Sequence, residues 1–130
     1  MTKPKVLVAR AIFPEVIDRL SEHFDITSNQ ADTVWTKTEL TEALRDKVGA
    51  FTTSSERIDA DVLAACPQLR IVANMAVGYN NFDIDAMTAR GVLATNAPDV
   101  LTETTADFGL ALLMATARRV TESERYLRAG

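Results

Sequence analysis

Two short segments combine residue types that could hold a small ligand without a charged side chain, the first an acid and the second a polar substrate. The first, residues 74–83, reads N-M-A-V-G-Y-N-N-F-D and leads from an apolar run to an aspartate suited to helix capping. Its backbone N–H groups at Ala76, Val77 and Gly78 could point toward an anion, as consecutive unpaired amides near a helix start do. The same spacing also fits a plain strand-to-helix turn, in which Gly78 merely permits the backbone conformation.

The second segment is a run of hydroxyl residues, T-T-S-S at positions 52–55. Ser54 and Ser55 could hold a small polar substrate if this run ends a strand next to the first segment. Serine and threonine also favour strand ends and turns for local reasons, so a purely structural role is an equal alternative.

Elements able to position these segments can be predicted from the hydrophobic pattern. Apolar residues at helical spacing follow Pro14, Thr36 and Glu39 form a capping-box pair, and Asp59 and Asp83 are suited to cap two further helices. Gly91 is suited to end the last of these helices in a left-handed turn. The helical stretches alternate with five predicted strands: Lys5–Ala9, Phe24–Thr27, Ala50–Thr53, Arg70–Met75 and Val92–Thr95.

This alternation predicts the fold class. The strands are short, nearly unbroken apolar runs, which is typical of a parallel sheet covered by helices on both faces. We therefore expect a doubly wound α/β domain with a five-stranded parallel sheet. Ligands of such sheets bind beyond the carboxyl ends of the strands, so the loops after Ala9, Thr53, Met75 and Asn96 are the candidate site.

The residue pattern of the chain changes near Pro98, from alternating strands and helices to one long helical stretch. Residues 96–99 are the only plausible hinge, so we predict one domain over residues 1–99 and a second segment over residues 100–130. That segment should begin with a long helix from about Leu101. Its stretch Thr102–Ala117 is rich in small residues and apolar nearly all round, so it needs cover on several sides.

Composition excludes several classes of function. With 47% hydrophobic residues, a net charge of −4 and no basic cluster, the 130-residue chain resembles an ordinary globular domain and not a nucleic-acid-binding protein. Cys66 is the only cysteine, so we expect neither an internal disulfide nor a metal site. The longest apolar run, residues 108–117, is about half of a membrane span. We expect a cytoplasmic protein without membrane contact.

Two kinds of catalytic equipment are missing from the sequence. No two of the five glycines stand in the G-x-G relation that brings backbone up to a dinucleotide pyrophosphate. The only histidine, His23, falls near the end of the first predicted helix, away from the candidate loops. We therefore predict no catalytic residue in this chain.

Three motifs in order resemble the D-isomer-specific 2-hydroxyacid dehydrogenases, with most similarity to their glyoxylate/hydroxypyruvate reductase branch. They are residues 74–83, then G-V-L-A-T-N at 91–96, then P-D-V-L-T-E-T-T-A-D at 98–107. The opening K-V-L-V-A-R and the stretch T-T-S-S-E-R-I-D are similar too, so the resemblance covers essentially the whole chain. The sequence departs from the family at Asn80, often Asp, and at Asp107, often Glu.

The resemblance implies a flavodoxin-like substrate domain, a hinge helix and a dinucleotide-binding domain. It implies a homodimeric oxidoreductase that acts on the CH–OH group of small 2-hydroxy acids and reduces 2-oxo acids with NADH or NADPH. Ala76, Val77 and Gly78 match the loop that binds the substrate carboxylate, Ser54 and Ser55 match a neighbouring substrate loop, and Thr104 falls where the hinge helix approaches the nicotinamide. The family's glycine fingerprint and catalytic arginine, glutamate and histidine would follow Gly130, so we expect the front part of a longer enzyme, inactive alone.

Two other classes of protein fit parts of the pattern. A receiver-type signalling domain has this size and alternation, but it needs acidic residues after the first and third strands and a lysine after the fifth. Here those positions hold Arg10, Thr53–Ser55 and Asn96–Ala97. A non-catalytic binding or assembly module is the other alternative, in which the helix Thr102–Ala117 docks a partner chain.

Overall fold

The computed structural model describes residues 2–130, which form two compact units. The first unit extends to Ala97 and contains the sheet with its helices. The second unit is Pro98–Gly130 and contains the last two helices. Among residues 2–130, no helix combines the length and the apolar character needed to cross a bilayer.

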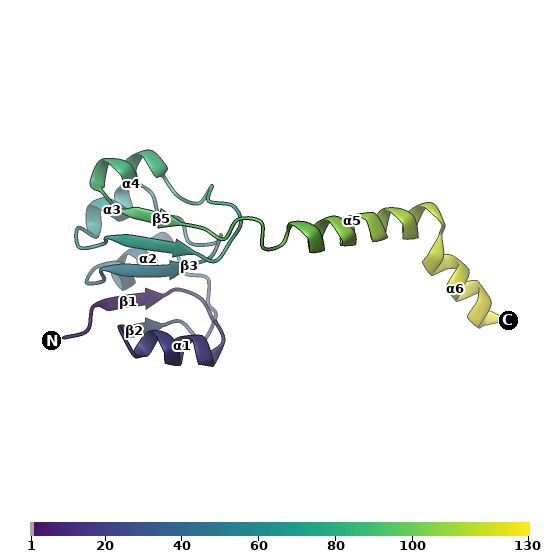
Figure 1. Ribbon diagram of the computed structural model, residues 1–130, viewed down its shortest axis with the longest axis horizontal. Coiled ribbons are helices and arrows are strands. Elements are labelled where there is room, and N and C mark those ends of the chain that lie inside the picture. Colours follow the sequence, from purple (N-terminus) through teal and green to yellow (C-terminus); the bar gives the residue numbers. More distant parts are fainter. Residues whose placement is uncertain (1) are drawn as a thin grey trace. The chain divides into compact units, whose positions relative to one another are not determined.

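Five parallel strands form a single sheet in the order β2-β1-β3-β4-β5 (Figure 1). This is the strand order of flavodoxin-like doubly wound domains, which confirms the predicted fold class. Each predicted strand end lies within one residue of the observed end, as expected for boundaries set by hydrogen bonds. The strands are β1 (Lys5–Val8), β2 (Asp25–Ser28), β3 (Gly49–Thr52), β4 (Ile71–Asn74) and β5 (Leu93–Thr95).

The helices between the strands begin and end where the sequence signals predicted. They are α1 (Pro14–Ser21), α2 (Lys37–Leu44), α3 (Ala60–Ala65) and α4 (Ile84–Arg90). Thr36 and Glu39 form the capping box of α2, and Asp83 accepts a hydrogen bond from the N–H of Ala86 at the start of α4. Gly91 ends α4 in the left-handed conformation, with φ of 66°.

The hydrophobic core lies against one face of the sheet. Leu7, Ala50 and Val72 are neighbours across three strands, so their side chains point to the same face. They pack with buried residues of α2, α3 and α4, namely Leu40, Leu44, Val62, Leu63 and Met87. Figure 1 places α1 in front of the sheet and α2 and α3 behind it.

The opposite face of the sheet is covered only in part. It is the face of α1, which has no buried residue of its own. Ile71 and Leu93, adjacent residues of β4 and β5, alternate with the core-facing positions and are 40% and 66% exposed. Helices thus lie on both sides of the sheet, with a complete core on one side.

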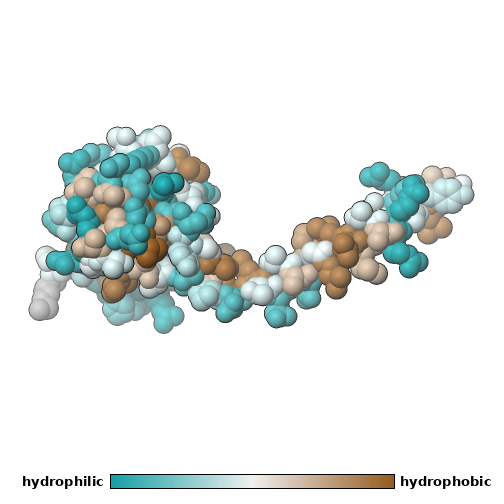
Figure 2. Space-filling view, turned by 90° about the horizontal axis from the view of Figure 1, so that it is seen from above, coloured by the Kyte–Doolittle hydropathy of each residue, from teal (hydrophilic) through white to brown (hydrophobic). Residues whose placement is uncertain are grey.

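The second unit contains α5 (Thr102–Ala117) and α6 (Val120–Ala129). The first of these is the predicted long helix. The second was not predicted, because its mostly polar sequence lacks the apolar stretch that marked α5. Arg119 separates them in the left-handed conformation, with φ of 53°. Neither helix has a buried residue, and Figure 2 shows hydrophobic side chains at the surface of α5.

Candidate functional site

The candidate loops lie at the carboxyl edge of the sheet. Because all five strands are parallel, the loops after β1, β3 and β4 emerge at the same edge. The chain passes from β1 to one side for β2 and returns to the other side of β1 for β3, so the topological switch point lies between β1 and β3. Doubly wound domains bind ligands at this point.

In the loop after β4, residues 76–78 have hydrogen-bonded carbonyl groups, whereas their amides have no partner among the described residues. The carbonyl oxygen of Ala76 accepts from the N–H of Ala97 (2.9 Å). The carbonyl oxygens of Val77 and Gly78 accept from the side-chain amides of Asn96 (2.7 Å) and Asn74 (3.0 Å). Within residues 2–130, the N–H groups of Ala76, Val77 and Gly78 have no hydrogen-bond acceptor.

This loop is also accessible, which an anion-binding role requires. Val77 is 42% exposed, and Gly78 is exposed as well. The backbone of Gly78 lies outside the left-handed region, so glycine is not needed here for a positive φ. A Cβ at Gly78 would lie 3.3 Å from Oδ1 of Asn80, an exposed side chain. Glycine at this position therefore provides space and not conformational freedom.

The loop after β3 combines exposed hydroxyl groups with a buried carboxylate. Ser54 and Ser55 are exposed, whereas Glu56 is 4% exposed. Glu56 Oε2 accepts from both the N–H (2.8 Å) and the hydroxyl (3.0 Å) of Thr53. The buried carboxylate thereby fixes the turn that presents the two serines.

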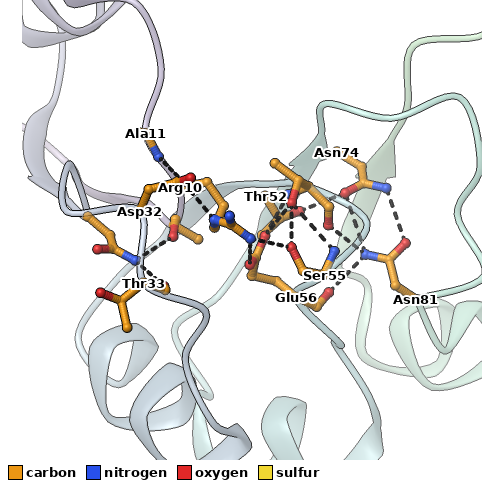
Figure 3. Close-up of polar contacts among 12 residues, drawn as sticks. Arg10, Ala11, Asp32, Thr33, Thr52, Ser55, Glu56, Asn74 and Asn81 are labelled. Carbon is orange, nitrogen blue, oxygen red and sulfur yellow. Dashed lines mark hydrogen bonds and ion pairs between the residues drawn. The ribbon is translucent and has the colours of Figure 1, made fainter.

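Two buried asparagines join this loop to the loop after β4 (Figure 3). The side-chain amide of Asn81 donates to the carbonyl oxygens of Thr53 (3.1 Å) and Glu56 (2.8 Å). That of Asn74 donates to Gly78 (3.0 Å) and to Oδ1 of Asn81 (3.2 Å). Thr52 completes the network with its hydroxyl, which donates to Oδ1 of Asn74 (3.0 Å). Every amide hydrogen of both side chains is thus used.

A single cation, Arg10, extends the network to the loops after β1 and β2. Its Nε donates to Asp32 Oδ1 (2.9 Å) and its Nη1 to the hydroxyl of Ser55 (2.7 Å), as Figure 3 shows. Nη1 also lies 3.8 Å from Glu56 Oε1. The hydrogen bond from Arg10 lowers the pKa of Asp32, and a bond from the N–H of Ala11 adds to this effect. Asp32 adopts a left-handed conformation, with φ of 57°, and such strain is typical of functional loops.

The structure thus brings the loops of the predicted residues Ser54, Ser55 and Ala76–Gly78 to one edge of the sheet and joins them. Thr104 lies in the first turn of α5, where it is exposed. Four further residues of the network were not predicted as site residues: Arg10, Glu56, Asn74 and Asn81. Their positions directly after β1, at the end of β4 and inside the two candidate loops were the available signal.

Other parts of the chain offer weaker candidates. One open depression of about 950 Å³ lies at the amino edge and is lined by residues that include Lys5, Asp25 and Asp46. We place the site at the carboxyl edge because the free amides lie there. Cys66 is buried, which raises the pKa of its thiol. Among the described residues, no group of three or more histidine, cysteine, aspartate or glutamate side chains could hold a metal ion.

The fold defines a flavodoxin-like domain with candidate ligand loops at its carboxyl edge. The family model of the D-isomer specific 2-hydroxyacid dehydrogenase catalytic domain matches residues 6–125, and the chain belongs to this family. The chain is 48% identical over 128 residues to a glyoxylate reductase of Thermococcus gammatolerans, covering 98% of the chain and 38% of the relative. It is 40% identical to glyoxylate/hydroxypyruvate reductase B of Klebsiella pneumoniae, covering 98% and 39%.

One solved structure is similar to this chain in both fold and sequence. It is an NADPH-dependent glyoxylate/hydroxypyruvate reductase of Sinorhizobium meliloti in complex with NADP and malonate. The TM-score is 0.75 at 36% identity, and the match covers 99% of this chain and 39% of that one. The chain therefore spans about two fifths of the length of the relatives that it matches.

Proposed function

We propose that this chain is the substrate-binding part of an NAD(P)-dependent reductase of small 2-oxo acids of the glyoxylate/hydroxypyruvate type. Residues up to 99 would form the substrate domain, and residues 100–130 the hinge helix and the start of a dinucleotide-binding domain. The observation that carries the proposal is the loop Ala76–Gly78, with three bonded carbonyl groups and three free amides. Such amides suit a carboxylate.

The residues of this chain do not fit a complete nicotinamide site. Its glycines lack the spacing that a dinucleotide pyrophosphate requires. Thr104 is the one residue that we assign to the cofactor, through the resemblance alone. The bound cofactor would supply the hydride, while this chain would bind and orient the acid. We therefore expect the 130-residue chain alone to bind 2-oxo acids without reducing them.

Titration of the 130-residue chain with glyoxylate, followed by amide NMR signals, tests the proposal. The signals of Ala76, Val77 and Gly78 should shift, because their N–H groups would donate to the carboxylate. Glycolaldehyde, which lacks the carboxylate, is the matched control ligand and should leave them unchanged. Equal shifts with both ligands, or glyoxylate shifts confined to other parts of the chain, would contradict the assignment.

An assembly function is the second candidate, favoured by the exposure of α5. Five large apolar side chains of this helix are at least 52% exposed: Phe108, Leu110, Leu112, Leu113 and Met114. Contiguous apolar surface of this kind marks an interaction site. We propose that α5 contributes to a homodimer, a role that is compatible with a substrate domain in the same chain.

A further inference from the structure

A chain of four hydrogen-bonded groups crosses the switch point between β1 and β3. Arg10 Nη1 lies 2.7 Å from Ser55 Oγ, and Ser55 Oγ lies 2.9 Å from Thr53 Oγ1. Thr53 Oγ1 in turn lies 3.0 Å from Glu56 Oε2. A hydroxyl group has a single proton to donate, so the order of the protons along this chain decides what Ser55 offers to a ligand.

The two ends of the chain fix that order. A guanidinium can only donate, and a carboxylate can only accept. The proton of the Thr53 hydroxyl is donated to Glu56, so Thr53 Oγ1 acts as an acceptor toward Ser55. The proton of the Ser55 hydroxyl is therefore directed to Thr53 and not to a ligand.

Both charged ends are held in place. Glu56 is 4% exposed and also accepts from the N–H of Thr53 at 2.8 Å. The Nε group of Arg10 is bound to Asp32 at 2.9 Å, and the Arg10 side chain is 19% exposed. Hydrogen bonds that end in charges at both sides are stronger than neutral ones and polarise the groups between them.

The hydroxyl oxygen of Ser55 keeps one position at which it can accept a hydrogen bond from a ligand. Its oxygen accepts one hydrogen bond from Arg10 and gives its proton to Thr53, so one lone pair remains. Ser55 is exposed at the carboxyl edge of β3, next to the loop after β4. Toward a ligand, Ser55 thus acts as an acceptor, which attracts a hydroxyl group and repels a carboxylate or carbonyl oxygen.

We propose that Ser55 is a specificity-determining residue that accepts a hydrogen bond from a hydroxyl group on the carbon next to the oxo group of the substrate. The site would then favour 3-hydroxy-2-oxo acids over 2-oxo acids with a methyl group at that position. This inference rests on the proposed function, in which the amides of Ala76–Gly78 hold the carboxylate. The other end of a small acid then faces the loop after the neighbouring strand β3.

The test compares hydroxypyruvate with pyruvate, which differ by this one hydroxyl group. The protein expressed from its complete reading frame is assayed with NADH and NADPH, and the ratio of the two kcat/KM values is determined. Ser55→Ala should lower the ratio of hydroxypyruvate to pyruvate about tenfold, because the substrate hydroxyl loses its acceptor. Thr53→Val releases the Ser55 proton and should lower the ratio about threefold.

A serine at the opposite edge of the sheet provides the control. Ser21 ends α1, and its hydroxyl donates to the carbonyl oxygen of Ile17 within the helix (2.8 Å). Ser21→Ala should leave the ratio unchanged. An active enzyme whose ratio is unaffected by both Ser55→Ala and Thr53→Val overturns the inference alone. A wild-type protein that reduces no 2-oxo acid overturns the proposed function, and the inference with it.

Discussion

Asn81 connects the two candidate loops more directly than any other side chain. It is 8% exposed, and both hydrogens of its amide are donated to carbonyl oxygens of the loop after β3. Its own oxygen accepts from Asn74, whose other amide hydrogen is donated to Gly78. A buried network in which every donor is used specifies one arrangement, because each lost bond leaves an unpaired polar group.

The stability of the fold should depend on the two amide donors of Asn81. Asn81→Asp keeps the shape of the side chain but directs a carboxylate oxygen at the carbonyl groups of Thr53 and Glu56. We expect the free energy of unfolding at neutral pH to fall by about 2–3 kcal/mol, as measured by urea denaturation. Asn80→Asp, at the exposed neighbouring position, is the matched control and should change stability by less than about 0.5 kcal/mol. Equal losses for both variants would show that the network has no special role.

The sequence predicted the loops of the site better than their contacts. The common location of Ser54, Ser55 and Ala76–Gly78 could be predicted because a parallel sheet brings strand ends together. The bond between Arg10 and Ser55 joins residues 45 positions apart, and the bond from Asn81 to Glu56 joins residues 25 positions apart. Such contacts depend on strand order, which hydropathy patterns do not determine. The network around Arg10 therefore required the structure.

At the scale of elements, local signals determine where each helix begins and ends. The pair Thr36 and Glu39 and the cap Asp83 act over three residues, so the sequence alone reveals them. Strand ends vary by a residue because they depend on the neighbouring strand. The helix α6 was missed because most of its residues are polar and the periodic apolar face is short.

Gly91 allows a prediction about helix termination. Its φ is 66°, and no atom beyond the glycine and its two chain neighbours lies within 4 Å of the position that a Cβ would occupy. Gly91→Ala should therefore destabilise the chain by about 1 kcal/mol through backbone strain alone, without a steric clash. Gly91→Asn should cost less, because asparagine tolerates the left-handed region. Urea denaturation of the three proteins measures both effects, and an alanine variant as stable as the wild type would contradict the explanation.

The acid stability of the chain should depend on an ion-pair group that links β1 to the turn before β3. The hydrogen bond from Lys47 (2.5 Å), followed by that from Lys5 (2.7 Å), lowers the pKa of Asp46 from its ordinary value of 3.8 to about 2. A carboxylate with a lowered folded-state pKa stabilises the fold above its unfolded value, and this stabilisation is lost as the pH falls through the folded value. The relevant window thus lies between about pH 4 and pH 2.

Asp46→Asn removes this titration. The free energy of unfolding of the variant, measured by urea denaturation, should therefore fall less steeply between about pH 4 and pH 2 than that of the wild type. Asp18→Asn is the control, since Asp18 is exposed and forms no ion pair with the part of the chain that the structure describes. Parallel pH profiles for wild type and Asp46→Asn would contradict the role assigned to these ion pairs.

At the scale of the whole chain, the two units differ in how they use apolar residues. The first unit buries a core between the sheet and α2–α4 and exposes only part of the opposite face. The second unit buries none of the apolar side chains of α5. The sequence predicted the buried strands and the apolar character of α5, a helix that needs cover on several sides. It also predicted cover on both faces of the sheet, whereas Ile71 and Leu93 on the opposite face are 40% and 66% exposed. The hydrophobic pattern does not indicate which surface covers α5, because it describes a single helix and not its neighbours.

Exposure of α5 predicts self-association of the 130-residue chain. Its large apolar side chains, 52–64% exposed, gain stability when a second copy excludes water from them. Sedimentation velocity should therefore give a weight-average coefficient that rises with concentration. The double substitution Leu110→Glu and Met114→Glu places two charges four residues apart on one helix face and should weaken association at least about tenfold. Val34→Glu, at a 60% exposed position of the first unit, should leave association unchanged. A monomer at every concentration, or equal effects of both variants, would exclude α5 as the interface.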